Sequence, residues 1–115
     1  LTAAADSADV VIIGSYIGHN WDAVTANAPG AFAGFVETLV RRGRKPIVVA
    51  FGNPYLLRQV PSVPSYLIAW GGFPVSQQAA ARALLGTSAI SGHLPISIPP
   101  HVSRGAGEER APLTR

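Results

Sequence analysis

The stretch Asp9-Val10-Val11-Ile12-Ile13-Gly14 decides the fold of this chain. Its four β-branched apolar residues stand in a row and are followed directly by a glycine. Continuous apolar character, rather than alternation with polar residues, is typical of a strand buried on both faces, as in a parallel sheet. The same pattern recurs at 45–52 (KPIVVAFG) and at 65–71 (SYLIAWG). The sequence therefore predicts three buried, parallel strands.

The segment between the first two strands has the spacing of an amphipathic helix. Apolar residues recur on one helical face of residues 31–42, at Phe32, Phe35, Val36, Leu39 and Val40. Pro29-Gly30 precede this segment, and Gly43 is placed to end it. The basic residues of 41–45 then lie at the negative end of the helix dipole, an interpretation we favour over nucleic-acid binding.

The segments after the third strand predict a second helix and a short last strand. Residues 75–85 form the helix, with Ser76 as its N-cap and Gly86 as its stop. Residues 93–99 alternate in polarity and are bracketed by prolines, which favours an edge strand.

The resulting order, β-α-β-loop-β-α-β, predicts an α/β fold: a three-layer αβα sandwich with a small, mainly parallel sheet. A doubly wound sheet has about five or six strands. We therefore expect this sheet to be incomplete on one side, or to be completed by a partner chain. Residues 1–104 form the predicted truncated domain, and 105–115 are polar, glycine-containing and predicted to be a flexible tail.

Composition narrows the possible functions further. The chain has 115 residues and Cys 0, which excludes disulfides, thiolate metal sites and a cysteine nucleophile. It also has Met 0 and begins with Leu1, so we expect it to be part of a longer protein. Hydrophobic residues make up 48% and charged residues 13%, which suggests apolar surfaces covered by something else, including self-association. No apolar run reaches the roughly 18 residues of a membrane span.

Three loops follow the predicted strands, at 14–22, 52–55 and 71–74. Parallel sheets keep their sites at the carboxyl ends of the strands, so these loops should lie side by side. They and the strand ends carry five candidate site residues, namely His19, Asp22, Asn53, Tyr55 and Trp70. Such residues suit a polar ligand such as a sugar, because aromatic rings stack and amides hydrogen-bond. The alternative is that glycine and proline only turn the chain and Asn53 caps a turn.

Most other chemistries are not encoded. No Gly-x-Ser-x-Gly elbow is present, although Ser15 or Ser76 with His19 leaves a small stand-alone, esterase-like hydrolase as an alternative. No phosphate-binding glycine loop follows a strand, and the histidines lack metal-ligand spacing, so we expect no cofactor and no metal. Glycoside hydrolysis needs two carboxyl groups, and of the acidic residues only Asp22 lies in a strand-end loop.

Four motifs in order nevertheless resemble the C-terminal α/β domain of glycoside hydrolase family 3. The similarity is nearest to the β-N-acetylglucosaminidase (NagZ-like) branch and covers roughly residues 6–107. The leading strand at 8–14 fits the same domain. The motifs are Lys45-Pro-Ile-Val-Val-Ala-Phe-Gly52-Asn53-Pro54-Tyr55, Tyr66-Leu-Ile-Ala-Trp70, Gln77-Gln-Ala-Ala-Ala-Arg82-Ala-Leu-Leu-Gly86 and Ser91-Gly92-His93-Leu94-Pro95-Ile96-Ser97-Ile98-Pro99.

The resemblance implies an accessory role. Family members pair this domain with an N-terminal (β/α)8 barrel that carries the nucleophilic Asp, and in the NagZ-like branch the barrel also supplies the acid/base. In other branches the C-terminal domain supplies a Glu, and no residue here matches that motif. The resemblance thus implies a bacterial, exported or periplasmic protein whose carbohydrate substrate binds through the barrel. This chain would scaffold or flank the sugar site without catalysing alone. The family usually has Arg or Lys in place of His93, to which no role is assigned.

Overall fold

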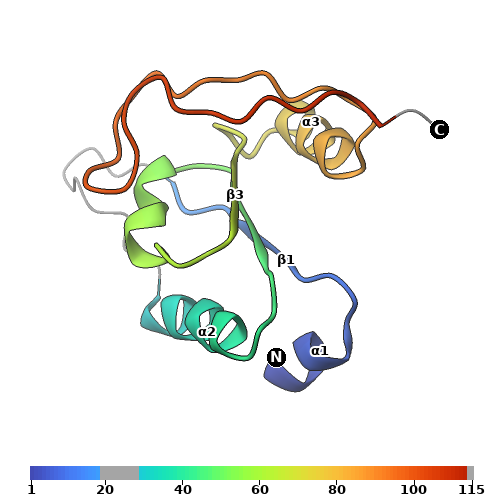
Figure 1. Ribbon diagram of the computed structural model, residues 1–115, viewed down its shortest axis with the longest axis vertical. Helices are drawn as coiled ribbons and strands as arrows, with labels where there is room; N and C mark the ends of the chain where they lie inside the picture. Colours follow the sequence, from blue (N-terminus) through green and yellow to red (C-terminus); the bar gives the residue numbers. More distant parts are fainter. Residues whose placement is uncertain (19–28, 114–115) are drawn as a thin grey trace.

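The computed structural model describes residues 1–18 and 29–113. Within these ranges the chain forms helices and strands in an alternating order (Figure 1). The elements are α1 (Thr2–Ser7), β1 (Ile12–Ser15), α2 (Gly30–Arg41), β2 (Ile47–Ala50), the 3-10 helix η1 (Pro54–Gln59), β3 (Ser65–Ile68) and α3 (Pro74–Leu84). In this described part, no helix is both long and apolar enough to cross a membrane.

The sheet has three strands in the order β1-β2-β3, and both pairs are parallel. Ile12 lies opposite Ile47, which in turn lies opposite Ser65. Helices α1 and α2 lie on one side of the sheet and α3 on the other (Figure 1). The predicted α/β fold with a small parallel sheet is confirmed, because each of the three predicted parallel strands overlaps one observed strand.

The core lies between the sheet and α2, and η1 closes it. Val36 of α2, Val48 of β2, and Leu56 and Val60 in and after η1 are buried together. Burying a side chain of this kind stabilises the fold by about 1.5–3 kcal/mol relative to leaving it exposed. Val36 belongs to the apolar face that the helical spacing predicts, so the prediction of this helix is confirmed.

Both long helices end two residues before the predicted glycines. Gly43 has φ +76 and Gly86 has φ +72, the left-handed conformation that glycine adopts without a Cβ penalty. The start of α3 differs from the prediction. Its N-cap is Phe73, and Ser76 lies inside the first turn, because Pro74 already supplies a φ suited to the first helical position. Ser76 is therefore not the N-cap.

Two short elements escape the sequence patterns. Helix α1 packs against α2, and the basic residues after α2 hold it there. Arg42 donates to the carboxylate of Asp6, and Arg44 donates to the carbonyl of Ala8. These two arginines, which directly follow α2, therefore hold α1 against α2. Helix η1 is the other unpredicted element.

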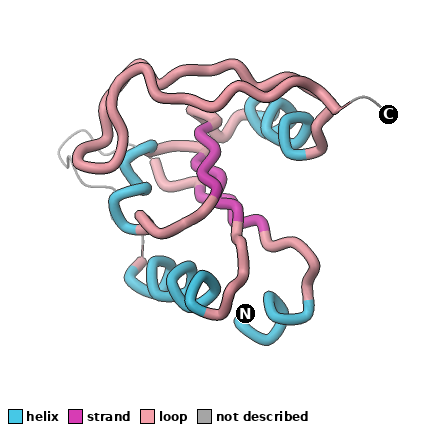
Figure 2. The backbone as a smooth tube through the Cα atoms, in the orientation of Figure 1, coloured by secondary structure: helices cyan, strands magenta, loops and turns pink. Residues whose placement is uncertain are grey.

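The predicted strand at 93–99 is wrong. Residues 86–113 form a long arm of two antiparallel segments, drawn as loop in Figure 2. Only single bridges form within it, Ile90 with Arg110 and Ile98 with Val102. A regular ladder is interrupted because proline, present at 95 and 99, cannot donate a backbone hydrogen bond. Residues 105–113 return along 86–94 through hydrogen bonds such as that from the Leu113 amide to the Gly86 carbonyl.

Candidate functional site

The carboxyl ends of the three strands lie at one edge of the sheet, because all three strands are parallel. Backbone hydrogen bonds continue past the strands and hold the following segments together. The Phe51 amide donates to the Ser15 carbonyl at 2.8 Å, and the Ala69 amide donates to the Ala50 carbonyl at 2.9 Å. The segments 16–18, 51–53 and 69–73 therefore form a fixed edge, here called the carboxyl edge.

Gly52 brings the first two of these segments into close contact. A Cβ on Gly52 would lie 2.2 Å from the Ile17 carbonyl oxygen, closer than real Cβ atoms come to a heavy atom. The neighbouring Asn53 amide donates a 2.8 Å hydrogen bond to that same oxygen. Only glycine leaves room for this approach, so the loops after β1 and β2 depend on it.

Aromatic residues lie in all three segments of the carboxyl edge. The rings of Tyr16 and Phe51 stack with centroids 4.7 Å apart and planes 9° from parallel. Gly72 lies against the Tyr16 ring, since a Cβ there would be 3.1 Å from Cδ1. Tyr16, Trp70 and Phe73 are all exposed to solvent. The aromatic residues of the carboxyl edge are thus Tyr16, Phe51, Trp70 and Phe73.

Trp70 has an unusual backbone conformation. Its φ is +62, and the residue is 50% exposed to solvent. The left-handed conformation costs a residue with a Cβ about 1–2 kcal/mol, and strain of this kind concentrates at functional sites. The fold therefore holds an indole ring at the end of β3 at a cost in conformational energy.

Asn53 is buried, and its side-chain Oδ1 accepts a 2.9 Å hydrogen bond from the Tyr55 amide. This bond caps η1. Of the two roles considered for Asn53, a ligand contact and a turn cap, the structure shows the cap. Tyr55 packs partly against the core, and the Arg58 guanidinium lies 5.0 Å from its ring centroid. A sugar contact by Asn53 or Tyr55 stays a prediction.

Tyr66 of β3 makes a hydrogen bond to the start of η1. Its hydroxyl donates a 3.0 Å hydrogen bond to the Pro54 carbonyl, joining β3 to the start of η1. Burial raises the pKa of Tyr66 well above its ordinary value, because the buried phenolate would lose its hydration. The phenol therefore stays protonated and acts as a donor. Nothing in the sequence pattern identifies this bond, because it joins residues that meet only in the folded chain.

The structure does not bring together the residues proposed for a hydrolase site, namely Ser15, Ser76, His19 and Asp22, within the part of the chain that it describes. Ser15 is buried at the end of β1, and Ser76 lies in the first turn of α3, near Gly71. His19 and Asp22 lie outside the described residues. Pairing of either serine with His19, and any role of Asp22, therefore stay predictions.

His93, which the sequence left without a role, joins the two segments of the arm. Its Nδ1 lies 3.2 Å from the Gly105 carbonyl oxygen, and its Nε2 lies 3.3 Å from Oε1 of Glu109. Among residues 1–18 and 29–113, no three His, Asp or Glu side chains are grouped so that they could hold a metal ion.

The model of the glycosyl hydrolase family 3 C-terminal domain matches residues 1–112. Neither the curated proteins nor the solved structures contain a significant match to the chain.

Proposed function

Because the chain belongs to the glycosyl hydrolase family 3 C-terminal domain family, we propose that it is the accessory domain of a β-N-acetylglucosaminidase-like enzyme of the NagZ-like branch. The observation that carries the proposal is the family match, which covers 1–112. In this role the chain scaffolds or flanks the sugar site and does not catalyse alone. The motifs quoted above support this branch, and with it a bacterial, exported or periplasmic enzyme.

The carboxyl edge supports a role beside a sugar. A pyranose ring presents a face of C–H bonds, which packs on an aromatic ring, and a rim of hydroxyl groups. Trp70 and Tyr16 are aromatic residues exposed to solvent, and backbone hydrogen bonds hold the segments that carry them. A fixed aromatic surface loses little conformational entropy when a ligand packs on it.

The acidic residues support the absence of catalysis by this chain alone. None of the segments 16–18, 51–53 and 69–73 contains an Asp or Glu. Glu109 contacts His93, Asp6 pairs with Arg42, and Glu108 pairs with Arg110 at 2.6 Å. Two carboxyl groups on either side of a glycosidic bond, about 5–10 Å apart, are what the reaction requires. In this proposal the barrel supplies them.

An activity assay on the purified chain tests the proposal. We expect no turnover of a chromogenic β-N-acetylglucosaminide above the uncatalysed rate. Turnover that Asp22→Ala abolishes would contradict the proposal, because the chain would then carry its own catalytic carboxylate. Glu37→Ala is the matched control, since Glu37 is an exposed residue within α2 and not in a loop that follows a strand.

A further inference from the structure

The loop between β3 and α3 carries Trp70 and two glycines directly after it. Backbone hydrogen bonds hold the two ends of this loop, at the Ala69 amide and at the Phe73 carbonyl. Between these ends, and within the described part of the chain, no backbone hydrogen bond joins residues 70–72 to another segment. Glycine has more conformational freedom than any other residue. A further contact is therefore needed to keep the middle of the loop in one conformation.

The side chain of Gln77 makes this contact. Gln77 lies one turn into α3, and its Nε2 donates a 2.9 Å hydrogen bond to the Gly72 carbonyl. The backbone of a helix is ordered by its own hydrogen bonds. The bond from Gln77 therefore ties the middle of the loop to an ordered element.

The two glycines lie against aromatic rings of the carboxyl edge. A Cβ on Gly72 would be 3.1 Å from Cδ1 of Tyr16, and a Cβ on Gly71 would be 3.5 Å from Cδ2 of Phe73. Gly72 thus contacts the Tyr16 ring and stands two residues after Trp70. The position of Gly72 consequently determines how the chain runs from Trp70 past Tyr16.

We propose that Gln77 is a positioning residue of the carboxyl edge, because it holds the loop that carries Trp70. Through Gly72, it sets where Trp70 lies relative to Tyr16. In this role, which rests on the sugar contact proposed above, Gln77 removes freedom from the two glycines before a sugar arrives. A surface that is ordered in advance binds more tightly than one that the ligand must order. The positive φ of Trp70 also requires such support, since a strained backbone persists only where its surroundings hold it.

Gln77→Glu tests this role, with Gln78→Glu as the matched control. Glutamate has the length of glutamine but directs an oxygen instead of an N–H at the Gly72 carbonyl, so the hydrogen bond is lost. Gln78 is also an exposed residue of α3, so the control makes the same change in charge one residue along the chain. An acidic residue near a helix N-terminus favours the helix, so neither variant weakens α3 through its charge.

Nuclear magnetic resonance titration of the full chain with N-acetylglucosamine measures the effect on binding. We expect Gln77→Glu to raise the dissociation constant by about threefold or more, the effect of one lost hydrogen bond. Gln78→Glu should leave it unchanged. Nitrogen-15 relaxation should show lower order parameters at residues 70–72 in Gln77→Glu alone. Gln77→Lys, which again places an N–H donor at this position, should restore both the affinity and the order parameters.

Circular dichroism checks that the variants fold, and Gln77→Ala with Gln78→Ala as its control replaces the glutamate pair if they do not. Equal affinity and equal order parameters in the two variants, with binding still lost in Trp70→Ala, overturn the role of Gln77 and leave the sugar contact standing. A change in only one of the two measurements also overturns it, because the role links loop order to affinity. A wild-type chain that does not bind the sugar, or binding that survives in Trp70→Ala, overturns the sugar contact and the role of Gln77 together.

Discussion

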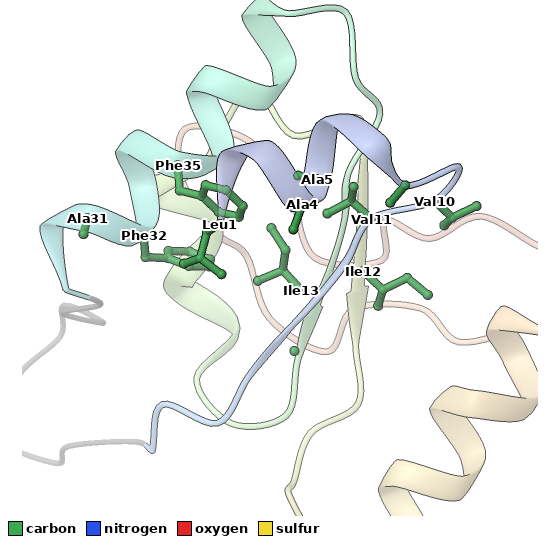
Figure 3. Close-up of a pocket in the computed structure, with 12 residues that line it drawn as sticks. Leu1, Ala4, Ala5, Val10, Val11, Ile12, Ile13, Ala31, Phe32 and Phe35 are labelled. Carbon is green, nitrogen blue, oxygen red and sulfur yellow. The ribbon is translucent and has the colours of Figure 1, made fainter.

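Two edges of the same small sheet present different surfaces. At the carboxyl edge, backbone hydrogen bonds join the segments that follow the three strands, and Gly52 lies against the Ile17 carbonyl. Exposed aromatic residues lie on these segments. The outer edge of β1 leaves backbone groups unpaired, within the part of the chain that the structure describes, beside an apolar groove between α1 and the first turns of α2 (Figure 3). A rigid surface with rings suits a small ligand, while an open strand suits another strand. The two edges of one small sheet therefore differ both in backbone pairing and in the side chains they present.

The largest expected effect comes from Gly52→Ala. The new Cβ would meet the Ile17 carbonyl oxygen at 2.2 Å, so the loops after β1 and β2 must separate and lose the Asn53 amide bond. We expect the free energy of unfolding to fall by at least about 2 kcal/mol, as for other disruptions of a packed backbone contact. Urea denaturation measures the change.

Gly34→Ala is the control for that substitution. Gly34 lies inside α2 with open space around it, so a Cβ meets no atom there. Alanine should raise the free energy of unfolding by about 0.5–1 kcal/mol, because it favours the helix. If both variants change stability alike, the carboxyl edge is not held by this contact.

A smaller effect is expected from Tyr66→Phe. Loss of the hydroxyl leaves the Pro54 carbonyl without its donor and should lower the free energy of unfolding by about 1 kcal/mol at pH 7. Burial raises the folded-state pKa of Tyr66, so its contribution to stability is complete below the ordinary tyrosine pKa of about 10 and is lost as pH rises above it.

Urea denaturation between pH 8 and 11 measures this dependence. Stability of the wild type should fall more steeply above pH 10 than that of Tyr66→Phe. Equal slopes would mean that the Tyr66 hydroxyl is not shielded from solvent, and the packing of β3 against the start of η1 would then be looser than described.

An effect of similar size distinguishes two substitutions of Trp70. Both Trp70→Ala and Trp70→Gly remove the indole ring, but only glycine adopts φ +62 without strain. We expect the glycine variant to be more stable than the alanine variant by about 1 kcal/mol, the reverse of the usual order. Thermal denaturation of both variants measures the difference. Greater stability of the alanine variant would show that the backbone at Trp70 is not strained.

The regular part of the fold could be predicted because its signals are local. Each of the three apolar runs overlaps one strand, and Gly43 and Gly86 follow the helices whose ends they predict. Helix η1 was missed although Asn53-Pro54 is a recognised helix-start signal, an N-cap followed by proline. The prediction of an edge strand at 93–99 was wrong because it treated the flanking prolines as compatible with the edge of a sheet, whereas in the structure the prolines interrupt the ladder.

The candidate site was only partly predictable. Position at a strand end predicted that Trp70 and Asn53 lie at the carboxyl edge, because parallel topology brings strand ends together. The same reasoning did not give Tyr16 or Phe73 a role, although both are exposed aromatic residues in the predicted loops. The stacking of Tyr16 on Phe51 and the bond from Tyr66 to Pro54 depend on tertiary contacts that no local pattern contains.

The central claim is that the carboxyl edge flanks a sugar, and nuclear magnetic resonance titration of the chain with N-acetylglucosamine tests it most directly. We predict shift changes confined to residues 16–18, 51–53 and 69–73, lost in Trp70→Ala and retained in Leu85→Ala, an exposed control at the end of α3. Shift changes that spare these segments, or that survive in Trp70→Ala, would contradict the claim.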